Sequence, residues 1–167
     1  MSGDPTIRRA TEADAAAIER VARDAWHAAY DDELGADRVE ETVDAWFDPG
    51  RLVDDDIGDP ERSVFVAEID GGVVGFAELV PDDDEDARCH LYRIYVASAH
   101  WGRGVGGALL DRAEAAARER GFERLELSVM AANERAVRFY EAHGFDRIGS
   151  THDDAMGVQV HEYEQRL

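Results

Sequence analysis

The spacing of apolar residues changes along the chain between the period of a strand and the period of a helix. Cys89–Val96 is rich in β-branched and aromatic residues, which predicts a strand. After residue 104 the apolar residues recur at the spacing that lines one face of a helix, namely at Val105, Ala108, Leu109, Ala113 and Ala116. A strand, a glycine-rich loop and a helix therefore follow one another at the centre of the chain.

Two helices are predicted in the first 50 residues. Thr11 and Asp14 have the spacing of a capping box, so the first helix begins there, and it is expected to end near Tyr30. Apolar positions between residues 39 and 47 indicate the second helix, which Pro49-Gly50 is expected to end. The acidic segment that follows, residues 51–62, is predicted to be a loop.

The remaining apolar segments predict strands and one further helix. Strands are expected at residues 6–9, 63–69, 73–80, 122–130, 146–151 and 158–167. Asp70-Gly71-Gly72, between the second and third of these, is a hairpin signal. Asn133 is suited to cap the further helix, and Gly144 followed by Phe145 is suited to end it.

Length and composition predict one globular domain over residues 1–167, because 44% hydrophobic residues are enough for a core. The chain has 18 basic and 38 acidic residues and a formal net charge of −20, which argues against nucleic acid or an anionic membrane as partner. No apolar run is long enough to span a membrane, and Met1–Pro5 lacks the core of a signal peptide. A cytoplasmic location is therefore expected.

The acidity itself has two interpretations. A chain with a net charge of −20 repels itself at low ionic strength, whereas molar salt shortens the Debye length to about 3 Å and removes most of that cost. We therefore predict a protein of a salt-rich, halophilic cytoplasm. An acidic surface that recruits basic substrates would use the same charges, so both interpretations stay open.

No metal site is predicted. The lone Cys89 cannot form an internal disulfide, and without a second cysteine nearby it does not indicate zinc. The acidic segment 81–86 does not have the spacing of a metal-binding loop and is expected to be a solvated loop between two strands.

The central loop holds four glycines, Gly102, Gly104, Gly106 and Gly107. Without a β-carbon, a ligand can approach the backbone closely, and the free N–H groups lie at the positive end of the helix macrodipole. Such a loop is suited to an anion, most naturally a pyrophosphate.

Three kinds of loop compete for this pattern. Gly102, Gly104 and Gly107 satisfy the dinucleotide pattern G-x-G-x-x-G, but five residues separate Val96 from Gly102, and no acidic residue closes the next strand. Gly102 and Gly107 also frame a P-loop, yet Ala108-Leu109 follows where Lys-Ser/Thr is required. A plain glycine-rich turn is the third interpretation.

A wider pattern, x-x-x-G-x-G on strand, loop and helix followed by a strand, an Asn and a Tyr seven residues later, closely resembles the GNAT superfamily of acetyl-CoA-dependent N-acetyltransferases. The resemblance covers the chain from about Thr6 to the last strand. One position departs from it, because Trp101 stands where the family usually has Gln or Arg. The matching residues are Ile94-Tyr95-Val96, Gly102-Arg103-Gly104-Val105-Gly106-Gly107, Asn133 and residues 136–145.

The resemblance implies an α/β (α+β) fold, a single domain with a mixed, mostly antiparallel sheet flanked by helices. It implies acetyl-CoA as acetyl-donor cosubstrate, without a metal. The predicted cofactor contacts are Ile94, Tyr95, Val96, Gly102, Arg103, Gly104, Val105, Gly106, Gly107, Asn133 and Tyr140. A bulge in the central strand would free a main-chain donor for the thioester oxygen, and Val96 is the expected donor.

Acetyl transfer to a primary amine also needs proton transfers. Tyr140 matches the family's general acid for the leaving thiolate, with packing beside Phe139 as the other interpretation. Glu78 and His90 are the candidate general bases, although ordered water can replace a base.

We expect direct attack in a ternary complex, since Cys89 is a poor acyl carrier. The acceptor is a small-molecule or peptide amine, and the protein a monomer or homodimer. The first two helices border the acceptor site in the family, so their aromatic residues are either core or wall of that site: Trp26, Tyr30, Trp46 and Phe47. A non-catalytic CoA-binding or sensor module is the alternative function.

Overall fold

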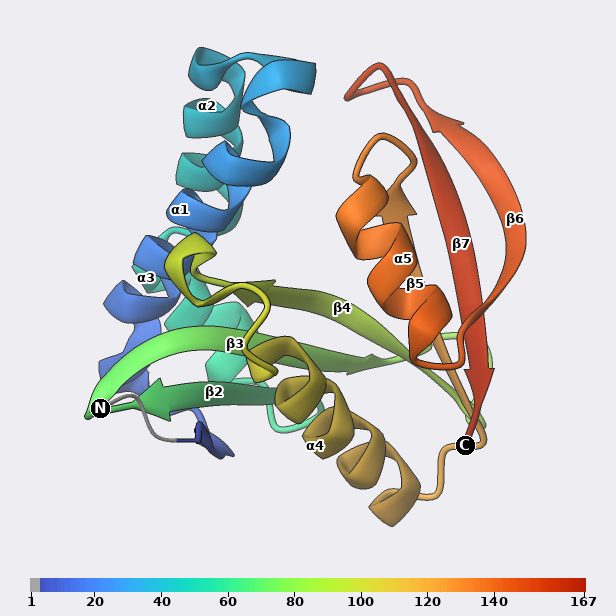
Figure 1. The fold of residues 1–167 in the computed structure, drawn as a ribbon. Helices are drawn as coiled ribbons and strands as arrows, with labels where there is room; N and C mark the ends of the chain where they lie inside the picture. Colours follow the sequence, from blue (N-terminus) through green and yellow to red (C-terminus); the bar gives the residue numbers. More distant parts are fainter. Residues whose placement is uncertain (1–3) are drawn as a thin grey trace.

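A computed structural model of the chain describes residues 4–167. Residues 1–3, part of the segment Met1–Pro5 that was expected to lack a signal-peptide core, lie outside the described residues. The chain forms one seven-stranded sheet. Helices lie on both sides of this sheet (Figure 1). The helices are α1 Ala15–Leu34, α2 Ala36–Trp46, α3 Pro49–Arg51, α4 Val105–Glu119 and α5 Glu134–Ala142. The strands are β1 Thr6–Arg9, β2 Ser63–Ile69, β3 Gly72–Pro81, β4 Arg88–Val96, β5 Arg124–Met130, β6 Asp146–Asp153 and β7 Val158–Arg166.

The strands form one sheet in the order β1-β2-β3-β4-β5-β7-β6. Among the described residues, β4 and β5 form the only parallel pair, and every other neighbouring pair is antiparallel. The predicted mixed, mostly antiparallel sheet flanked by helices is therefore confirmed.

Each face of the sheet has its own hydrophobic core. Phe65 and Ala67 of β2 pack with Leu109 and Leu110 of α4 on one face. Alternate residues of the same strand point to the other face, where Val66 joins the core beneath α1 and α2. Since β2 is buried on both faces, it has a continuous apolar sequence rather than an alternating one.

Several local signals are confirmed. The Thr11 main-chain N–H donates to the Asp14 carboxylate at 2.8 Å, as a capping box requires. Asp70 and Gly71 have φ of 52° and 80°, the left-handed pair that a two-residue hairpin turn needs. The Asn133 Oδ1 atom accepts from the Ala136 N–H at 3.1 Å and so caps α5.

Two expectations about the N-terminal half are wrong. Residues 51–62 are not all loop, because α3 begins at Pro49 and continues into a π-helical turn, η2 Leu52–Ile57. Proline is tolerated in the first helical turn, and the Asp48 carboxylate accepts from the Arg51 N–H at 3.1 Å, so Pro49 starts this helix instead of ending the previous one. Helix α1 also runs beyond Tyr30 to Leu34. Within residues 4–167, no helix is long and apolar enough to cross a membrane.

Candidate functional site

The sheet opens between β4 and β5. Within the described residues these strands pair only at Arg88–His90 with Arg124–Glu126, and beyond His90 they diverge (Figure 1). A cleft of about 1130 Å³ lies where they part, between the end of β4, the glycine loop, the end of β5, α5 and α1. It contains all of the predicted cofactor contacts except Arg103.

The irregularity expected in the central strand is present, and Tyr92 is its extra residue. Glu78 of β3 pairs with Arg93, whereas the next residue, Leu79, pairs with Leu91, so Tyr92 is left without a partner in this register. Beyond the bulge, the Ala97 N–H donates to the Val74 carbonyl at 2.8 Å. Because antiparallel pairs alternate, the main-chain groups of Ile94 and Val96 point away from β3, toward the cleft.

The glycine loop has the backbone that the pattern predicts. Gly104, the residue before α4, has φ of 84°, a left-handed conformation that side chains rarely adopt. A β-carbon on Gly106 would lie 3.3 Å from the Phe139 ring of α5, so this glycine allows α4 and α5 to approach closely. The first N–H groups of α4 are therefore directed at one end of the cleft.

Trp101, the residue that departs from the family pattern, has a partner from another element. Its indole N–H donates to the Val96 carbonyl at 2.8 Å, which holds the ring on the end of β4. The guanidinium carbon of Arg135, on α5, lies 3.8 Å from the centre of this ring. Stacking of this kind positions a cation without neutralising it. Arg135 was not predicted as a site residue, because no local signal joins α5 to Trp101.

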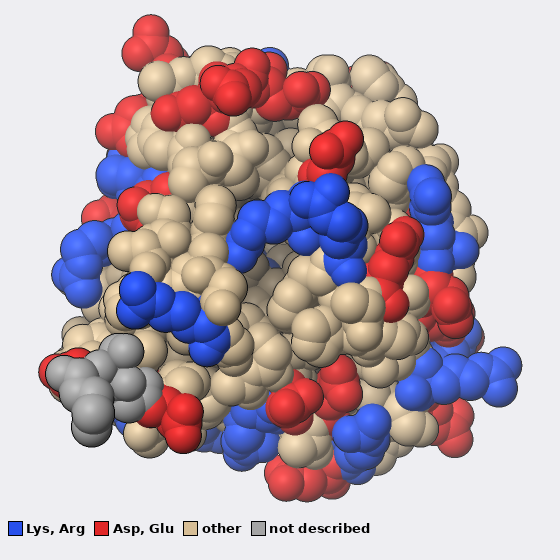
Figure 2. Space-filling model, in the orientation of Figure 1, with Lys and Arg blue, Asp and Glu red and all other residues tan. Residues whose placement is uncertain are grey.

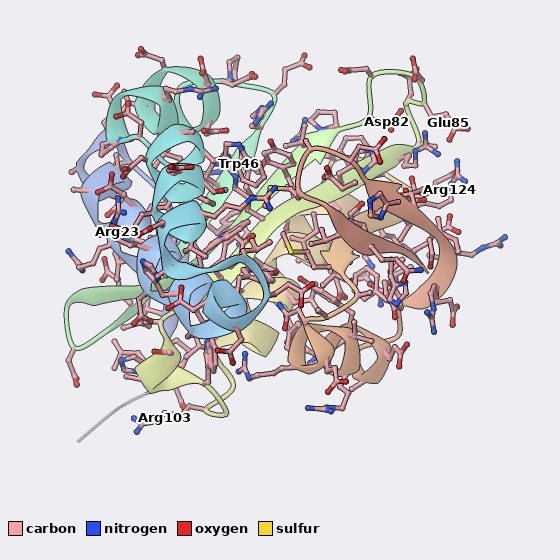
Figure 3. The ribbon with its side chains drawn as sticks, turned by 90° about the horizontal axis from the view of Figure 1, so that it is seen from above. Arg23, Trp46, Asp82, Glu85, Arg103 and Arg124 are labelled. Carbon is pink, nitrogen blue, oxygen red and sulfur yellow. The ribbon has the colours of Figure 1, made fainter. Side chains whose placement is uncertain are left out.

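The cations at the cleft differ in where they point. Arg135 and Arg138 line the cleft, and within residues 4–167 neither forms an ion pair. Partial burial lowers the pKa of Arg135. Arg103 is exposed and does not line the cleft; Figure 3 shows its side chain pointing outward from the loop. Figure 2 shows basic side chains beside a hollow on this face of the molecule.

Asn133 joins two elements across the cleft. Besides capping α5, its amide nitrogen donates to the Tyr30 hydroxyl of α1 at 3.0 Å. Tyr30 is 5% exposed, and burial raises its pKa. The link from α1 to α5 fixes the distance between the two walls, which the sequence did not reveal.

Tyr140 lies in the wall of the cleft with its ring packed against Phe139 and Phe145, at centroid distances of 5.4 and 5.7 Å. Burial, together with the Tyr30 phenol, raises the pKa of Tyr140 above its usual range. Within the described residues its hydroxyl has no hydrogen-bond partner, although the side chain is only 8% exposed. A protonated phenol is therefore free to donate into the cleft.

The two candidate bases do not line the cleft. Glu78 is 1% exposed and accepts from Arg62 Nη1 at 3.0 Å; burial, with a further contribution from Asp56, raises the pKa of Glu78 to about 8. His90 lies 2.6 Å from Asp82, Nε2 to Oδ2. In Figure 3, Asp82 lies at the opposite end of the molecule from Arg103 and the glycine loop.

No group of three or more His, Cys, Asp or Glu side chains in residues 4–167 is arranged to hold a metal ion. Cys89 is fully buried, and burial raises the pKa of its thiol to about 12. A thiol that stays protonated is a weak nucleophile.

Known proteins share this fold and sequence pattern. The PaiA N-acetyltransferase of Thermoplasma acidophilum, crystallised with coenzyme A, superposes with a TM-score of 0.84 at 21% identity, over 99% of this chain and 100% of that one. The uncharacterized N-acetyltransferase YjgM of Escherichia coli is 34% identical over 158 residues, 94% of this chain and 89% of that protein. An uncharacterized N-acetyltransferase of Mycobacterium tuberculosis is 35% identical over 103 residues. This match covers 58% of this chain and 65% of that relative's length.

These findings define a class and then a family. The open sheet, the cleft and the named relatives are those of acyltransferases. The sequence pattern of the acetyltransferase (GNAT) family matches residues 17–145, which is most of the chain. The chain belongs to this family.

Proposed function

We propose that the protein transfers the acetyl group of acetyl-CoA to a primary amine by direct attack in a ternary complex. The observation that carries this proposal is the divergence of β4 from β5, which directs the main-chain groups of Ile94 and Val96 along a cleft that ends at the N-terminus of α4. A linear amide-containing chain with a pyrophosphate at one end fits such a cleft.

The pyrophosphate would lie on the N–H groups of the glycine loop, as predicted for Gly102, Gly104, Gly106 and Gly107. Arg135 and Arg138 would face it from α5, because they line the same cleft without a carboxylate partner among the described residues. Arg135 then supplies the charge that Trp101 cannot, with the indole as its support. Arg103 is exposed, so it would contact only phosphate groups of acetyl-CoA that lie outside the cleft.

The pantetheine amides would pair with the β4 edge at Ile94 and Val96, while the thioester oxygen accepts from a main-chain N–H of the same edge. Val96 was the expected donor to the thioester oxygen, and the Ile94 N–H is now a second candidate for this hydrogen bond. The N–H groups of both residues point away from β3, and Ile94 is the nearer to the bulge, two residues from Tyr92.

In the chemical step, the lone pair of the neutral amine forms the N–C bond, and collapse of the tetrahedral intermediate breaks the C–S bond. The thiolate takes the proton of the Tyr140 hydroxyl, and the proton lost by the amine returns to Tyr140 through water. Ordered water is favoured over Glu78 and His90 as the base, because neither side chain lines the cleft.

A thiol-release assay with acetyl-CoA and a panel of primary amines, at low and molar KCl, tests this proposal. The sequence contains no lysine, so acetylation of the enzyme's own lysine side chains adds no background. Amine-dependent release of CoA, with the acetylated amine identified by mass, is the expected result. Tight acetyl-CoA binding without transfer to any amine would favour the non-catalytic CoA-binding module instead.

A further inference from the structure

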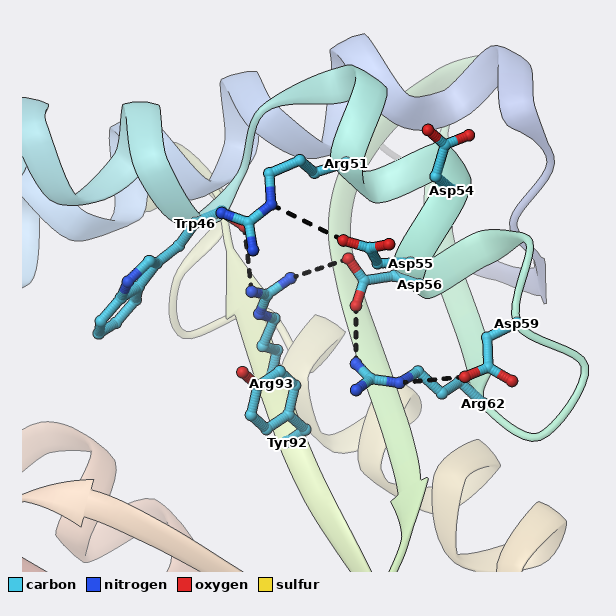
Figure 4. A pocket seen from close by; sticks show the side chains of 9 residues that line it. All are labelled: Trp46, Arg51, Asp54, Asp55, Asp56, Asp59, Arg62, Tyr92 and Arg93. Carbon is cyan, nitrogen blue, oxygen red and sulfur yellow. Dashed lines mark hydrogen bonds and ion pairs between the residues drawn. The ribbon is translucent and has the colours of Figure 1, made fainter.

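A second cavity, of about 610 Å³, lies beside the cleft under the turn η2 (Figure 4). It shares Trp46, Tyr92 and Arg93 with the cleft, so the two cavities meet at the bulge of β4. Trp46 and Tyr92 are 43% and 54% exposed, unusually open for large apolar side chains. A molecule in this cavity would reach the position where β4 is expected to hold the thioester.

The floor of the cavity contains a buried donor without a partner. Arg93 is 10% exposed and lies between the rings of Phe47 and Tyr92, at 4.4 and 4.9 Å from its guanidinium carbon. Its Nη2 atom donates to the Trp46 carbonyl at 3.1 Å. Its Nη1 atom is buried and, among the described residues, has no hydrogen-bond partner. Buried donors are normally satisfied, so a ligand oxygen is the natural complement.

The charge around Arg93 selects the kind of oxygen. Nη1 is 3.6 Å from both the Asp56 carboxylate and the Glu78 carboxyl group, too far for hydrogen bonds, and Asp56 is close enough to balance its charge. A carboxylate on the ligand would be repelled by Asp56 and by the other aspartates that line the cavity, Asp54 and Asp55. A neutral carbonyl oxygen accepts the hydrogen bond without adding a negative charge.

The rim of the cavity is acidic. Asp54 and Asp55 are exposed, and within residues 4–167 Asp54 forms no ion pair. Asp55 is 3.7 Å from Arg51, and both side chains are 62% exposed, so this pair is weak. Because Asp54 and Asp55 line this cavity and not the cleft, the rim suits a cation on the part of the ligand farthest from the cleft.

We propose, on the basis of the function proposed above, that this cavity binds the acceptor as a peptide-like amine. The free amine points to the cleft, the adjoining amide carbonyl accepts from Arg93, and a basic side chain lies on the rim formed by Asp54 and Asp55. The substrate class is therefore the amino group of a basic aminoacyl amide or peptide, rather than an alkyl polyamine or a free amino acid.

Three matched acceptors test this class. L-Argininamide has the amine, the carbonyl and the cation; agmatine lacks the amide; L-citrullinamide replaces the cation with a neutral group of the same shape. We expect kcat/KM for L-argininamide to exceed that for the other two by about tenfold, the size of one hydrogen bond or contact to a charged group. Equal or better turnover of agmatine would overturn the proposal.

Variants separate the two contacts. Agmatine is the more basic amine, so the two acceptors also differ in intrinsic reactivity. Arg93→Met corrects for this difference, because its ratio of kcat/KM for L-argininamide to kcat/KM for agmatine should be about tenfold lower than that of the wild type. In D54N/D55N, on the exposed rim, the argininamide-to-citrullinamide ratio should fall toward one. Ratios within one variant do not depend on the folded fraction, and D54N/D55N still tests the proposal if Arg93→Met does not fold. An unchanged ratio in either test overturns the proposal.

Calorimetry with acetyl-CoA distinguishes the two proposals. Wild type that binds acetyl-CoA but does not acetylate L-argininamide overturns this inference and leaves the cofactor site standing. Wild type that does not bind acetyl-CoA overturns the proposed function itself. D54N/D55N should retain the acetyl-CoA affinity of the wild type, since neither residue lines the cleft.

Discussion

The cleft and the cavity beside it are built by different means. The cleft is made largely of main chain, with Ile94 and Val96 on an open strand edge and Gly104 in a left-handed turn before α4. The cavity is made of side chains, in which Asp56 and Arg62 from the segment after α2 meet Arg93 from β4. Main-chain sites leave short sequence patterns, whereas a charge network assembled from distant segments leaves none.

The largest effect is expected from closing the main-chain site. Gly104→Asp places a carboxylate at the N-terminus of α4, where the phosphates are proposed to bind, and should weaken acetyl-CoA binding by more than a hundredfold in calorimetry. Aspartate is a good helix N-cap and tolerates a left-handed backbone, so the variant should still fold. Gly121→Asp is the matched control, because Gly121 also has φ of 84° but lies beyond the other end of α4. Equal loss in both variants would indicate strain rather than a blocked site.

Removing the Tyr140 hydroxyl should give the next largest effect. Tyr140→Phe should lower kcat by about 10² to 10⁴-fold, the usual contribution of a general acid, with little change in acetyl-CoA affinity. Tyr163→Phe is the control, because Tyr163 is fully buried and donates to Glu141 at 2.8 Å, outside the cleft lining. If Tyr140→Phe keeps its rate within about threefold while chemistry is rate-limiting, another group or water protonates the thiolate.

Loss of the stacked cation should have a smaller effect. Arg135→Gln is expected to weaken acetyl-CoA binding about tenfold, as for one charge-assisted contact, and to leave S-acetylpantetheine, which lacks the phosphates, unaffected. Arg103→Gln should change the affinity less, because Arg103 is exposed outside the cleft lining. Arg118→Gln, at the far end of α4, controls for net charge. An equal loss for S-acetylpantetheine would argue against a phosphate contact.

The smallest effect tests the charge network through pH. The folded-state pKa of Glu78 is raised to about 8, so the native state binds a proton more readily than the unfolded chain, whose glutamates titrate near 4.3. The stability that the protonated form supplies is therefore complete below about pH 4 and is lost as pH rises to about 8. Relative to wild type, the Tm of Glu78→Gln should rise by a few degrees between pH 5 and pH 9. A constant Tm difference would show that Glu78 is ionised throughout.

The sequence predicted what depends on local signals. The hairpin at Asp70-Gly71, the Asn133 cap and the glycine loop each need a particular residue at a particular backbone conformation, and all three are confirmed. The bulge was expected from the family resemblance, whereas its place at Tyr92 depends on the pairing of β3 with β4, which no single segment determines.

The expectations that failed depend on contacts between distant segments. Residues 51–62 carry many aspartates and were predicted as loop, but burial of Leu52 and the ion pairs of Asp56 with Arg62 and Arg93 favour a helical turn. The assignment of Glu78 and His90 as candidate bases stays a prediction; Glu78 contacts Arg62, His90 contacts Asp82, and neither side chain lines the cleft. The halophilic interpretation of the net charge of −20 stays a prediction.

The proposed cofactor path along β4 is tested most directly by amide hydrogen exchange, measured residue by residue with and without acetyl-CoA. The Ile94 and Val96 amides point away from β3, whereas the Tyr95 amide faces Phe76 within the β3–β4 ladder. Acetyl-CoA should slow exchange at Ile94 and Val96 by tenfold or more, with a much smaller change at Tyr95. Uniform slowing of all three amides, or no change at Ile94 and Val96, would contradict binding along this strand edge.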